Sequence, residues 1–238
     1  MSAAPVRFGV VVFPGSNCDA DACHALSTFP GTSAQYLWHK DTDLKGVQAV
    51  ILPGGFSYGD YLRCGAIARF SPVMDAVIRH AEGGGLTLGI CNGFQVLVEA
   101  GLLPGALLRN ASLEFRCVWT NLKVQTTDSP FTQRLEVGDV LRVPIAHGEG
   151  NYFAPPAVLR QLNEQRRVVF RYCDAEGRMA PESNPNGSVE NIAGLLSEGR
   201  NVLGMMPHPE RASEALLGSA DGKRVFDSLA KSFTDVAW

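Results

Sequence analysis

The sequence predicts an α/β fold, a parallel sheet with helices on both faces and a small antiparallel excursion. Short apolar runs that end at glycine, proline or polar residues alternate with segments of helical character. From Glu114 to Pro144 the composition changes instead to continuous β-forming sequence. The chain has 238 residues, 45% of them hydrophobic, which is enough to bury a sizeable core. No internal repeat or linker divides it, so we expect one domain over residues 1–238.

Four apolar runs in the first part of the chain predict parallel strands. They cover residues 6–13, 34–38, 47–52 and 86–90. A first helix is expected from Asp19 to Phe29. Its N-cap candidates are Ser16, Asn17 and Asp19, because short polar side chains accept hydrogen bonds from the free N–H groups at a helix start.

The second part of the chain predicts antiparallel pairing followed by a return to alternating elements. Strands are expected within the β-rich runs 114–124 and 139–145. After them the pattern predicts a helix at 156–164, a strand at 167–172, a loop rich in Pro, Asn and Gly at 181–188, and a strand at 201–206. The last helix is expected at 223–233, where apolar residues recur at helical spacing.

Composition excludes several classes of function. The formal net charge is -3, from 21 basic and 24 acidic residues without a long like-charged run, so we expect no nucleic-acid partner and no membrane partner. The apolar runs are far shorter than the roughly 18 residues of a membrane span. The run near the start is also too short for a signal peptide, so a cytoplasmic protein is expected.

The six cysteines form neither a disulfide framework nor a zinc ribbon, because the chain has no C-x-x-C pair. Cys18, Cys23 and His24 have the spacing C-x4-C-H, which matches no common metal site. Helix packing is the better interpretation of these three residues. We expect no bound metal.

The run G-I-C-N-G-F-Q, from Gly89 to Gln95, is the first candidate for chemistry. A strand, then G-x-C-x-G, then a helix is typical of a nucleophile elbow, where glycines avoid clashes between crowded backbones. Cys91 would then lie at a helix N-terminus, which favours the thiolate over the thiol. The N–H group of Asn92 would face a developing oxyanion. The alternative is that Cys91 is a small buried apolar residue, but the glycines favour the reactive interpretation. The helix is expected to run from Phe94 to Leu103.

The run from Leu52 to Asp60 is the second candidate. It contains G-F-S-Y-G, which matches the pattern G-x-S-x-G and makes Ser57 a rival nucleophile for a serine hydrolase. A second interpretation is that backbone N–H groups of the Gly54–Gly55 turn face Cys91 and complete an oxyanion hole. A third is a turn that simply needs glycine.

The run M-P-H-P-E-R, from Met206 to Arg211, is the third candidate. In an extended segment, residues two apart project to the same side, so Glu210 is expected beside the imidazole of His208. Cys91, His208 and Glu210 would then provide a nucleophile, a base and an orienting acid. The order Cys, His, Glu argues against Ser57, because an α/β-hydrolase places its acid before the histidine.

At these motifs the chain resembles the class I (triad) glutamine amidotransferases, whose signature G-x-C-x-G-x-Q is matched by Gly89, Cys91, Gly93 and Gln95. This resemblance implies a flavodoxin-like sheet. Within that family the chain is most similar to the glutaminase subunits of phosphoribosylformylglycinamidine synthases. The matching runs are F-P-G-S-N-C-D, L-W-H-K-D-T-D-L, G-G-F-S-Y-G-D-Y-L-R-C-G-A-I-A, G-I-C-N-G-F-Q-V-L, P-I-A-H-G-E-G-N-Y-F, N-P-N-G-S and M-M-P-H-P-E-R.

The resemblance implies roles for individual residues. Cys91, His208 and Glu210 match the catalytic triad, and Gln95 matches a residue that helps to hold glutamine. The backbone around Gly55, with Asn92, matches the oxyanion hole, and the loop Ala146–Glu149 matches a contact for the amino-acid end of glutamine. The implied substrate-binding residues are Gly54, Gly55, Phe56, Asn92, Gln95, His147 and Gly148. From the residues alone, His147 could equally be a turn residue.

The resemblance also implies a reaction and partners. The chain would hydrolyse glutamine and supply ammonia to a large synthetase subunit that makes formylglycinamidine ribonucleotide from formylglycinamide ribonucleotide in purine biosynthesis, with a small bridging subunit in the complex. No G-x4-G-K-[ST] motif is present, so ATP and Mg are expected on the synthetase and no cofactor in this chain. Two other functions are considered: a serine esterase using Ser57, and a non-catalytic binding subunit.

Overall fold

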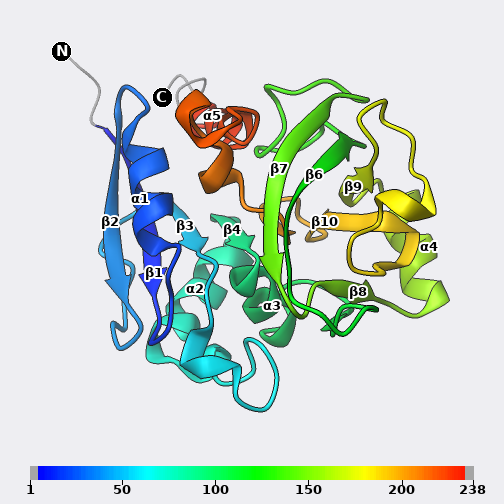
Figure 1. Cartoon of the computed structure of the whole chain (residues 1–238). Coiled ribbons are helices and arrows are strands. Elements are labelled where there is room, and N and C mark those ends of the chain that lie inside the picture. Colours follow the sequence, from blue (N-terminus) through cyan, green and yellow to red (C-terminus); the bar gives the residue numbers. More distant parts are fainter. Residues whose placement is uncertain (1–4, 234–238) are drawn as a thin grey trace.

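The computed structural model describes residues 5–233, and within them a nine-stranded sheet forms the centre of the molecule (Figure 1). The strand order is β2-β1-β3-β4-β11-β10-β9-β6-β7. Its first five strands are parallel, and their order 2-1-3-4 is that of flavodoxin-like sheets. The predicted fold class is confirmed. The five strands are β1 (Val6–Val12), β2 (Thr32–Trp38), β3 (Ala49–Leu52), β4 (Leu86–Ile90) and β11 (Val202–Met205).

The antiparallel part continues the same sheet, because β10 pairs with β11 on one side and with β9 on the other. Its strands are β10 (Ile192–Leu196), β9 (Val168–Cys173), β6 (Arg116–Val124) and β7 (Val140–His147). A separate two-stranded ladder joins β5 (Ala106–Leu108) to β8 (Asn151–Phe153). The sequence patterns did not predict β5, β8 or β10. All five residues of β10 are buried, so it lacks the polar alternation that marks a half-exposed strand.

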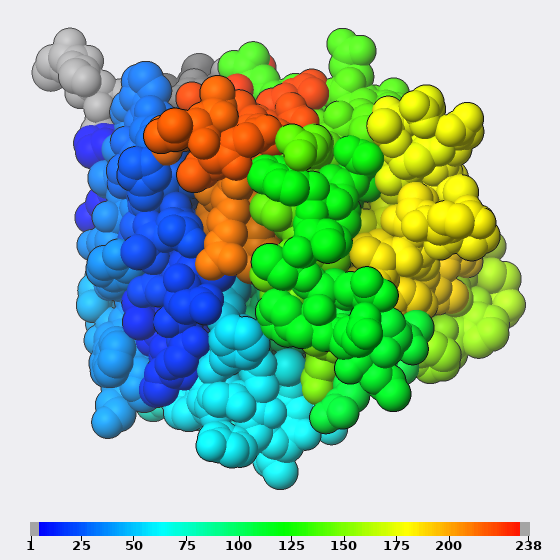
Figure 2. Space-filling view, viewed as in Figure 1, coloured from blue at the N-terminus to red at the C-terminus, as the bar shows by residue number. Residues whose placement is uncertain are grey.

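Helices cover the parallel part of the sheet on both faces. The helices there are α1 (Asp19–Ser27), α2 (Pro72–Glu82), α3 (Asn92–Glu99) and α5 (Lys223–Lys231), while α4 (Pro156–Glu164) lies at the antiparallel end of the sheet (Figure 1). Helix α1 packs on β1 and β2, while α2 and α3 lie on the opposite face, and α5 packs beside α1 (Figure 1). In the space-filling view the C-terminal segment lies between the N-terminal segment and the strands β6 and β7 (Figure 2).

Several helix boundaries differ from the sequence prediction: α1 ends at Ser27 rather than Phe29, α5 ends at Lys231 rather than Phe233, and α3 begins at Asn92 rather than Phe94. The N-cap of α1 is Cys18, which makes no side-chain capping bond, and the hydroxyl of Ser16 instead accepts a hydrogen bond from the N–H of Phe13. Helix α3 ends at Glu99 rather than Leu103, because the chain turns at Gly101 with a φ of +74°. The cap of α1 and the end of α3 depend on loop conformations, which the spacing of apolar residues does not reveal.

The three candidate loops all lie at the carboxyl ends of parallel strands. The chain leaves β3 into the glycine turn at Gly54, leaves β4 directly into Cys91, and leaves β11 into the segment that carries His208. The loop after β1 joins them, since the N–H groups of Asn17 and Cys18 both donate to the carbonyl of Gly54. Four loops that are distant in sequence therefore meet at one edge of the sheet.

Phe94 anchors the helix that follows Cys91. Its ring is fully buried, stacks on Tyr152 at 6.2 Å between centroids, and lies where a Cβ on Gly204 would come within 2.1 Å. We expect Phe94→Ala to lower the free energy of unfolding by about 3–5 kcal/mol, because the cavity cannot close against the rigid sheet. Phe153→Ala, at a half-exposed ring, is the control and should cost much less. Equal losses in urea unfolding would contradict this anchoring role.

Candidate active site

Cys91 lies at a strained turn between β4 and α3. Its φ is 51° and its ψ is -105°, values that a residue with a side chain rarely adopts. Its N–H donates to the carbonyl of Met205 at 2.8 Å, which ties the turn to β11. A Cβ on Gly93 would lie 1.9 Å from the carbonyl oxygen of Leu52, and one on Gly89 would lie 2.7 Å from the carbonyl carbon of Gly93. The predicted reason for the glycines, backbone crowding, is confirmed.

His208 and Glu210 form a buried pair. His208 Nδ1 lies 2.6 Å from Glu210 Oε1, and the two residues are 1% and 2% exposed. The predicted contact is present, but the extended backbone predicted for this segment is wrong. His208 is followed by a 3-10 turn, Pro209–Ala212, and this turn brings the carboxylate back to the imidazole. The N–H of His208 donates to the carbonyl of Pro144 in β7 at 2.8 Å, which fixes the start of the turn.

The imidazole of His208 lies in a strongly negative environment. Burial alone would lower its pKa, but attraction to Glu210, and then to Cys91, raises the pKa well above the ordinary value. Within residues 5–233, His208 Nε2 and Glu210 Oε2 are buried and have no hydrogen-bond partner. One ring nitrogen is thus held by the acid, while the other is open to exchange a proton with Cys91 or a substrate.

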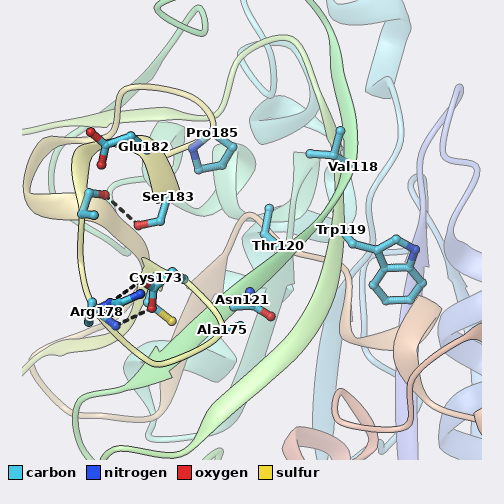
Figure 3. Close-up of a pocket in the computed structure, with 12 residues that line it drawn as sticks. Val118, Trp119, Thr120, Asn121, Cys173, Ala175, Arg178, Glu182, Ser183 and Pro185 are labelled. Atoms are coloured by element: carbon cyan, nitrogen blue, oxygen red, sulfur yellow. Dashed lines mark hydrogen bonds and ion pairs between the residues drawn. The ribbon is translucent and has the colours of Figure 1, made fainter.

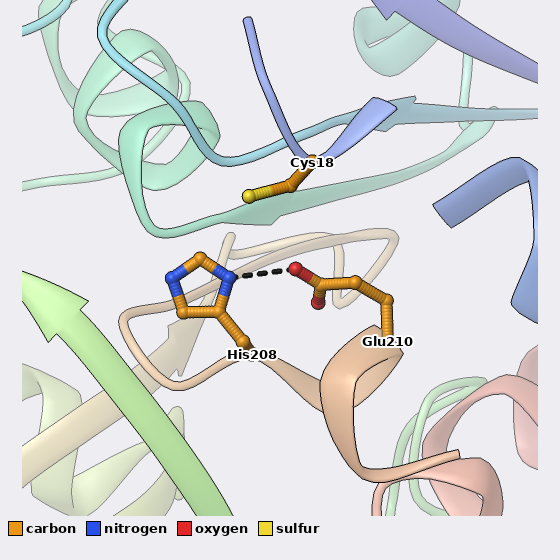
Figure 4. A group of neighbouring side chains, drawn as sticks. All are labelled: Cys18, His208 and Glu210. Atoms are coloured by element: carbon orange, nitrogen blue, oxygen red, sulfur yellow. Dashed lines mark hydrogen bonds and ion pairs between the residues drawn. The ribbon is translucent and has the colours of Figure 1, made fainter. Parts of the chain in front are cut away.

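Cys18 lies beside this pair (Figure 4). Ligand atoms of Cys18, His208 and Glu210 all lie within 4.8 Å of one another, a sulfur, nitrogen and oxygen set that could hold a metal ion. However, the guanidinium of Arg211 donates to Cys18 Sγ at 3.1 Å, and this fixed positive charge disfavours a cation there. Burial raises the pKa of the Cys18 thiol, although His208 and Arg211 oppose that shift.

The grouping of Cys18 with His208 was not anticipated. The sequence interpretation considered Cys18 with Cys23 and His24, but His24 Nε2 instead contacts Glu214 Oε1 at 2.5 Å. A signal was available, because Cys18 follows the end of β1, and the carboxyl ends of parallel strands lie at one edge of a sheet.

Two backbone N–H groups beside Cys91 are free to bind an oxyanion. Among residues 5–233, no acceptor is found for the N–H of Gly55 or for that of Asn92. The N–H of Phe56 is not available, because it donates to the carbonyl of Gly15 at 3.0 Å. Gly54 has a different role: a Cβ there would come within 2.6 Å of His208 Cε1, so glycine lets the base approach the turn.

Cys91 opens into a pocket of about 270 Å³. Its lining comes from the glycine turn and the segment after it, from the elbow and α3, from the connection between β5 and β6, and from the end of β7 with the loop that follows. The residues are Gly55, Phe56, Asp60, Cys64, Cys91, Gln95, Arg109, Phe115, Ala146, His147, Gly148 and Glu149. Most of the predicted substrate-binding residues therefore share one cavity with Cys91. Gln95 Nε2 donates to the carbonyl of Glu149 at 2.6 Å and its Oε1 accepts from Asn92 at 2.9 Å, so Gln95 fastens α3 to the pocket wall.

His147 is a buried strand residue rather than a turn residue. It ends β7, is 3% exposed, and its Nε2 lies 3.0 Å from Asn186 Nδ2. Burial, and then repulsion by His208, lower the pKa of His147 to about 3. Asn186 Nδ2 also donates to the carbonyl of Gly150 at 2.8 Å. Sequence reasoning assigned no role to Asn186, although its motif N-P-N-G-S was recognised.

Ser57 lacks the surroundings of a nucleophile. Its side chain is buried, and its Oγ has no hydrogen-bond partner within the described residues. Its N–H donates to Asn92 Oδ1 at 3.2 Å, which links the glycine turn to the elbow. Without a base beside the hydroxyl, the serine-hydrolase interpretation has no support in the geometry.

A cavity larger than the Cys91 pocket lies away from the triad (Figure 3). It has a volume of about 670 Å³ between β6 and the 173–185 segment, and none of the candidate site residues lines it. On its wall Arg178 pairs with Asp174 at 2.7 Å, and Ser183 Oγ donates to the carbonyl of Ala180. Both interactions are local to this segment, so the cavity shows no convergent chemistry.

Comparison with known proteins identifies the family. The family model described as a CobB/CobQ-like glutamine amidotransferase domain matches residues 5–228. A protein of Moorella thermoacetica is 60% identical over 224 residues, 94% of this chain and 95% of that one. One of Chlorobaculum tepidum is 61% identical over 226 residues, 95% and 97% of the two chains. Both are named phosphoribosylformylglycinamidine synthase subunit PurQ. The chain belongs to this family.

Solved structures agree with that assignment. The chain matches one titled as the structure of PurLQS from Thermotoga maritima, with a TM-score of 0.85, 47% identity, and 97% and 99% of the two chains covered. A structure titled as a glutamine amidotransferase from Thermotoga maritima, at 18% identity and a TM-score of 0.59, shares the fold. None of the helices in the described part of the chain is long and apolar enough to cross a membrane.

The low pKa of His147 predicts a specific pH dependence of stability. Its folded pKa of about 3 lies below the ordinary value of 6.5. The contribution of neutral His147 to the stability of the fold is therefore complete above pH 6.5 and is lost as the pH falls toward 3. When the pH falls from 7 to 5, this imidazole binds a proton in the unfolded state but not in the folded state, which should lower the free energy of unfolding by about 2 kcal/mol. His147→Gln should abolish that component in urea unfolding. Between pH 7 and pH 8 the two proteins should change in parallel, and an equal acid loss in both would contradict the assignment.

Proposed function

We propose that this chain is the glutaminase subunit of phosphoribosylformylglycinamidine synthase and uses Cys91, His208 and Glu210 as its catalytic triad. The observation that carries the proposal is the buried His208–Glu210 pair, whose imidazole interacts with Cys91, a cysteine held at a strained elbow. A positioned base with its own orienting acid is what a cysteine nucleophile requires.

The first half of the reaction transfers the glutamyl group to the enzyme. The Cys91 thiolate attacks the side-chain amide carbon of glutamine, and the N–H groups of Gly55 and Asn92 stabilise the oxyanion. One such donor contributes roughly 10²–10³ in rate. The carbon–nitrogen bond then breaks as protonated His208 gives its proton to the leaving ammonia, and a γ-glutamyl thioester remains on Cys91.

The second half regenerates the enzyme. Neutral His208 removes a proton from a water molecule, whose oxygen attacks the thioester carbon. The carbon–sulfur bond breaks, glutamate leaves, and Cys91 returns as the thiolate beside protonated His208. Glu210 stabilises the imidazolium whenever His208 is protonated, and its buried position prevents water from weakening that attraction.

The ammonia needs a consumer on another chain. We assign that step to a large synthetase subunit, which would use ATP and Mg to convert formylglycinamide ribonucleotide to formylglycinamidine ribonucleotide, with a small bridging subunit in the same cytoplasmic complex. The solved relative named PurLQS supports such an assembly. This chain would itself need no cofactor, because the triad supplies nucleophile, acid and base.

Substitution of Cys91 tests the proposal against its two rivals. In the reconstituted complex, Cys91→Ala should abolish glutamine-dependent synthesis and leave ammonia-dependent synthesis intact, because only the ammonia source is lost. It should also abolish labelling by 6-diazo-5-oxo-norleucine, which intact-mass analysis with peptide mapping measures. Ser57→Ala is the control. A serine esterase predicts the reverse pattern, and a non-catalytic subunit predicts no loss in either variant.

The isolated chain is expected to be a poor glutaminase. Ammonia released without a consumer is wasted, and sites of this class are commonly completed by the synthetase. Adding the synthetase should therefore raise glutamate release by about 5- to 150-fold, the range of ordinary coupling between sites. Equally fast hydrolysis by the pure chain would contradict this expectation.

A further inference from the structure

The buried His208–Glu210 pair has a third neighbour that the mechanism does not use. The sulfur of Cys18 lies on the side of the ring that carries Nδ1, where the imidazole meets the carboxylate (Figure 4). A Cβ on Gly54 would lie 3.1 Å from this sulfur and 2.6 Å from His208 Cε1, so the sulfur and the ring occupy adjacent positions at the glycine turn. Cys18 is 1% exposed, and its thiol donates to Asn17 Oδ1 at 3.1 Å. The sulfur is therefore a fixed part of the surroundings of this pair.

A positive charge is held against that sulfur. Arg211 Nη2 donates to Cys18 Sγ at 3.1 Å, and Arg211 Nε donates to Asp21 Oδ2 at 3.2 Å. Asp21 lies in the first turn of α1, so the guanidinium is fixed between this helix and the active site. Burial opposes the charge on Arg211, but attraction to Cys18, and then to Glu210, raises its pKa above the ordinary value. The guanidinium is therefore charged throughout the neutral pH range.

This charge lies near Glu210 without being paired to it. Among residues 5–233, no ion pair or hydrogen bond joins the side chain of Arg211 to that of Glu210, and Glu210 Oε2 has no partner. A thiol is only a weak hydrogen-bond acceptor, so Cys18 keeps the guanidinium in place without taking up its charge. In the described part of the chain, Arg211 is also the only lysine or arginine that lines the cavity of about 220 Å³ beside His208.

The charge of Arg211 opposes the attraction that holds a proton on His208. Glu210 stabilises the imidazolium, and a cation near Glu210 weakens that attraction. The other titratable groups that face the ring do not supply this effect. Cys91 as the thiolate strengthens the hold on the proton. His147 is uncharged at neutral pH, because burial, and then repulsion by His208, lower its pKa to about 3.

We propose that Arg211 is a positioning residue of the triad, which acts through Cys18 and Glu210 to weaken the hold on the His208 proton. The inference rests on the proposed glutaminase function and deepens it. His208 must give a proton to the leaving ammonia and later remove one from water, so neither a very strong nor a very weak hold serves both steps. Cys18 is the spacer that keeps the guanidinium from pairing with the carboxylate.

The hold on the proton is measured directly by NMR titration of the His208 imidazole in the full chain, in a Cys91→Ala background where no thiolate contributes. Arg211→Gln should raise the midpoint by about one pH unit, because the opposing charge is lost. Arg211→Lys keeps the charge and should leave the midpoint near that of the parent. Cys18→Ala should lower the midpoint, because the guanidinium can then pair with Glu210. The double variant Cys18→Ala/Arg211→Gln should show no such decrease.

The pH profile of glutamine hydrolysis in the complex with the synthetase provides a second readout. In Arg211→Gln the alkaline limb of kcat/KM should move up by about one pH unit, and kcat at neutral pH should fall by about 3- to 10-fold, since a more strongly held proton is transferred more slowly. Arg211→Lys should recover most of this loss. Arg160→Gln, at an exposed arginine on α4, is the matched control and should behave as wild type.

The two readouts separate this inference from the function on which it rests. An unchanged His208 midpoint in Arg211→Gln overturns the inference whatever happens to activity, and so does a shift of Arg211→Gln and Cys18→Ala in the same direction. If Arg211→Gln does not fold, Cys18→Ala decides alone, because only a guanidinium paired with Glu210 lowers the midpoint. If the midpoints shift as expected but the wild-type complex releases no ammonia from glutamine, the proposed function fails, while the action of Arg211 on the His208–Glu210 pair stands.

Discussion

The active site depends on the burial of an ion pair. His208 and Glu210 are almost fully removed from water, and such a pair is maintained only when the geometry is good and the surroundings are fixed. Removing either partner would leave an uncompensated buried charge. The surrounding structure supplies the constraint: the carbonyl of Pro144 holds the backbone of His208, the hydroxyl of Ser213 donates to the carbonyl of Glu210, and the absence of a side chain at Gly54 leaves room for the imidazole.

The position of this pair relative to Cys91 depends on a second constraint, which is the close approach of α3, β3 and β11 at the edge of the sheet. Cys91 keeps its unfavourable φ because its N–H is bonded to β11 and because α3 presses on the end of β3 at Gly93. The strand that fixes the nucleophile is therefore the same strand that leads into His208. This shared support explains how Cys91 and His208, which are 117 positions apart in the sequence (208 minus 91), are kept in a fixed position relative to each other without a direct bond between them.

The elements and contacts with a local sequence cause could be predicted. The parallel strands, the elbow at Cys91 and the pairing of His208 with Glu210 follow from apolar runs, glycine spacing and a short sequence separation. Other features had no such signal. Strand β10 is buried along its whole length, Cys18 reaches His208 only through the topology, and Asn186 reaches His147 from 39 residues away. The 3-10 turn after His208 was missed because the pattern H-P-E is equally compatible with an extended chain.

The two parts of the sheet contribute different components to the site. The parallel strands present Cys91 and His208, and their loops present the free N–H groups of Gly55 and Asn92. The antiparallel strands build the opposite wall, where β7 contributes Ala146 and His147 and the following loop contributes Glu149. Because Gln95 on α3 binds the backbone of Glu149, a shift of the antiparallel wall would be transmitted to the elbow helix. A partner that contacts either part of the sheet therefore has a direct structural route to the nucleophile, which is the arrangement that a glutaminase coupled to a synthetase requires.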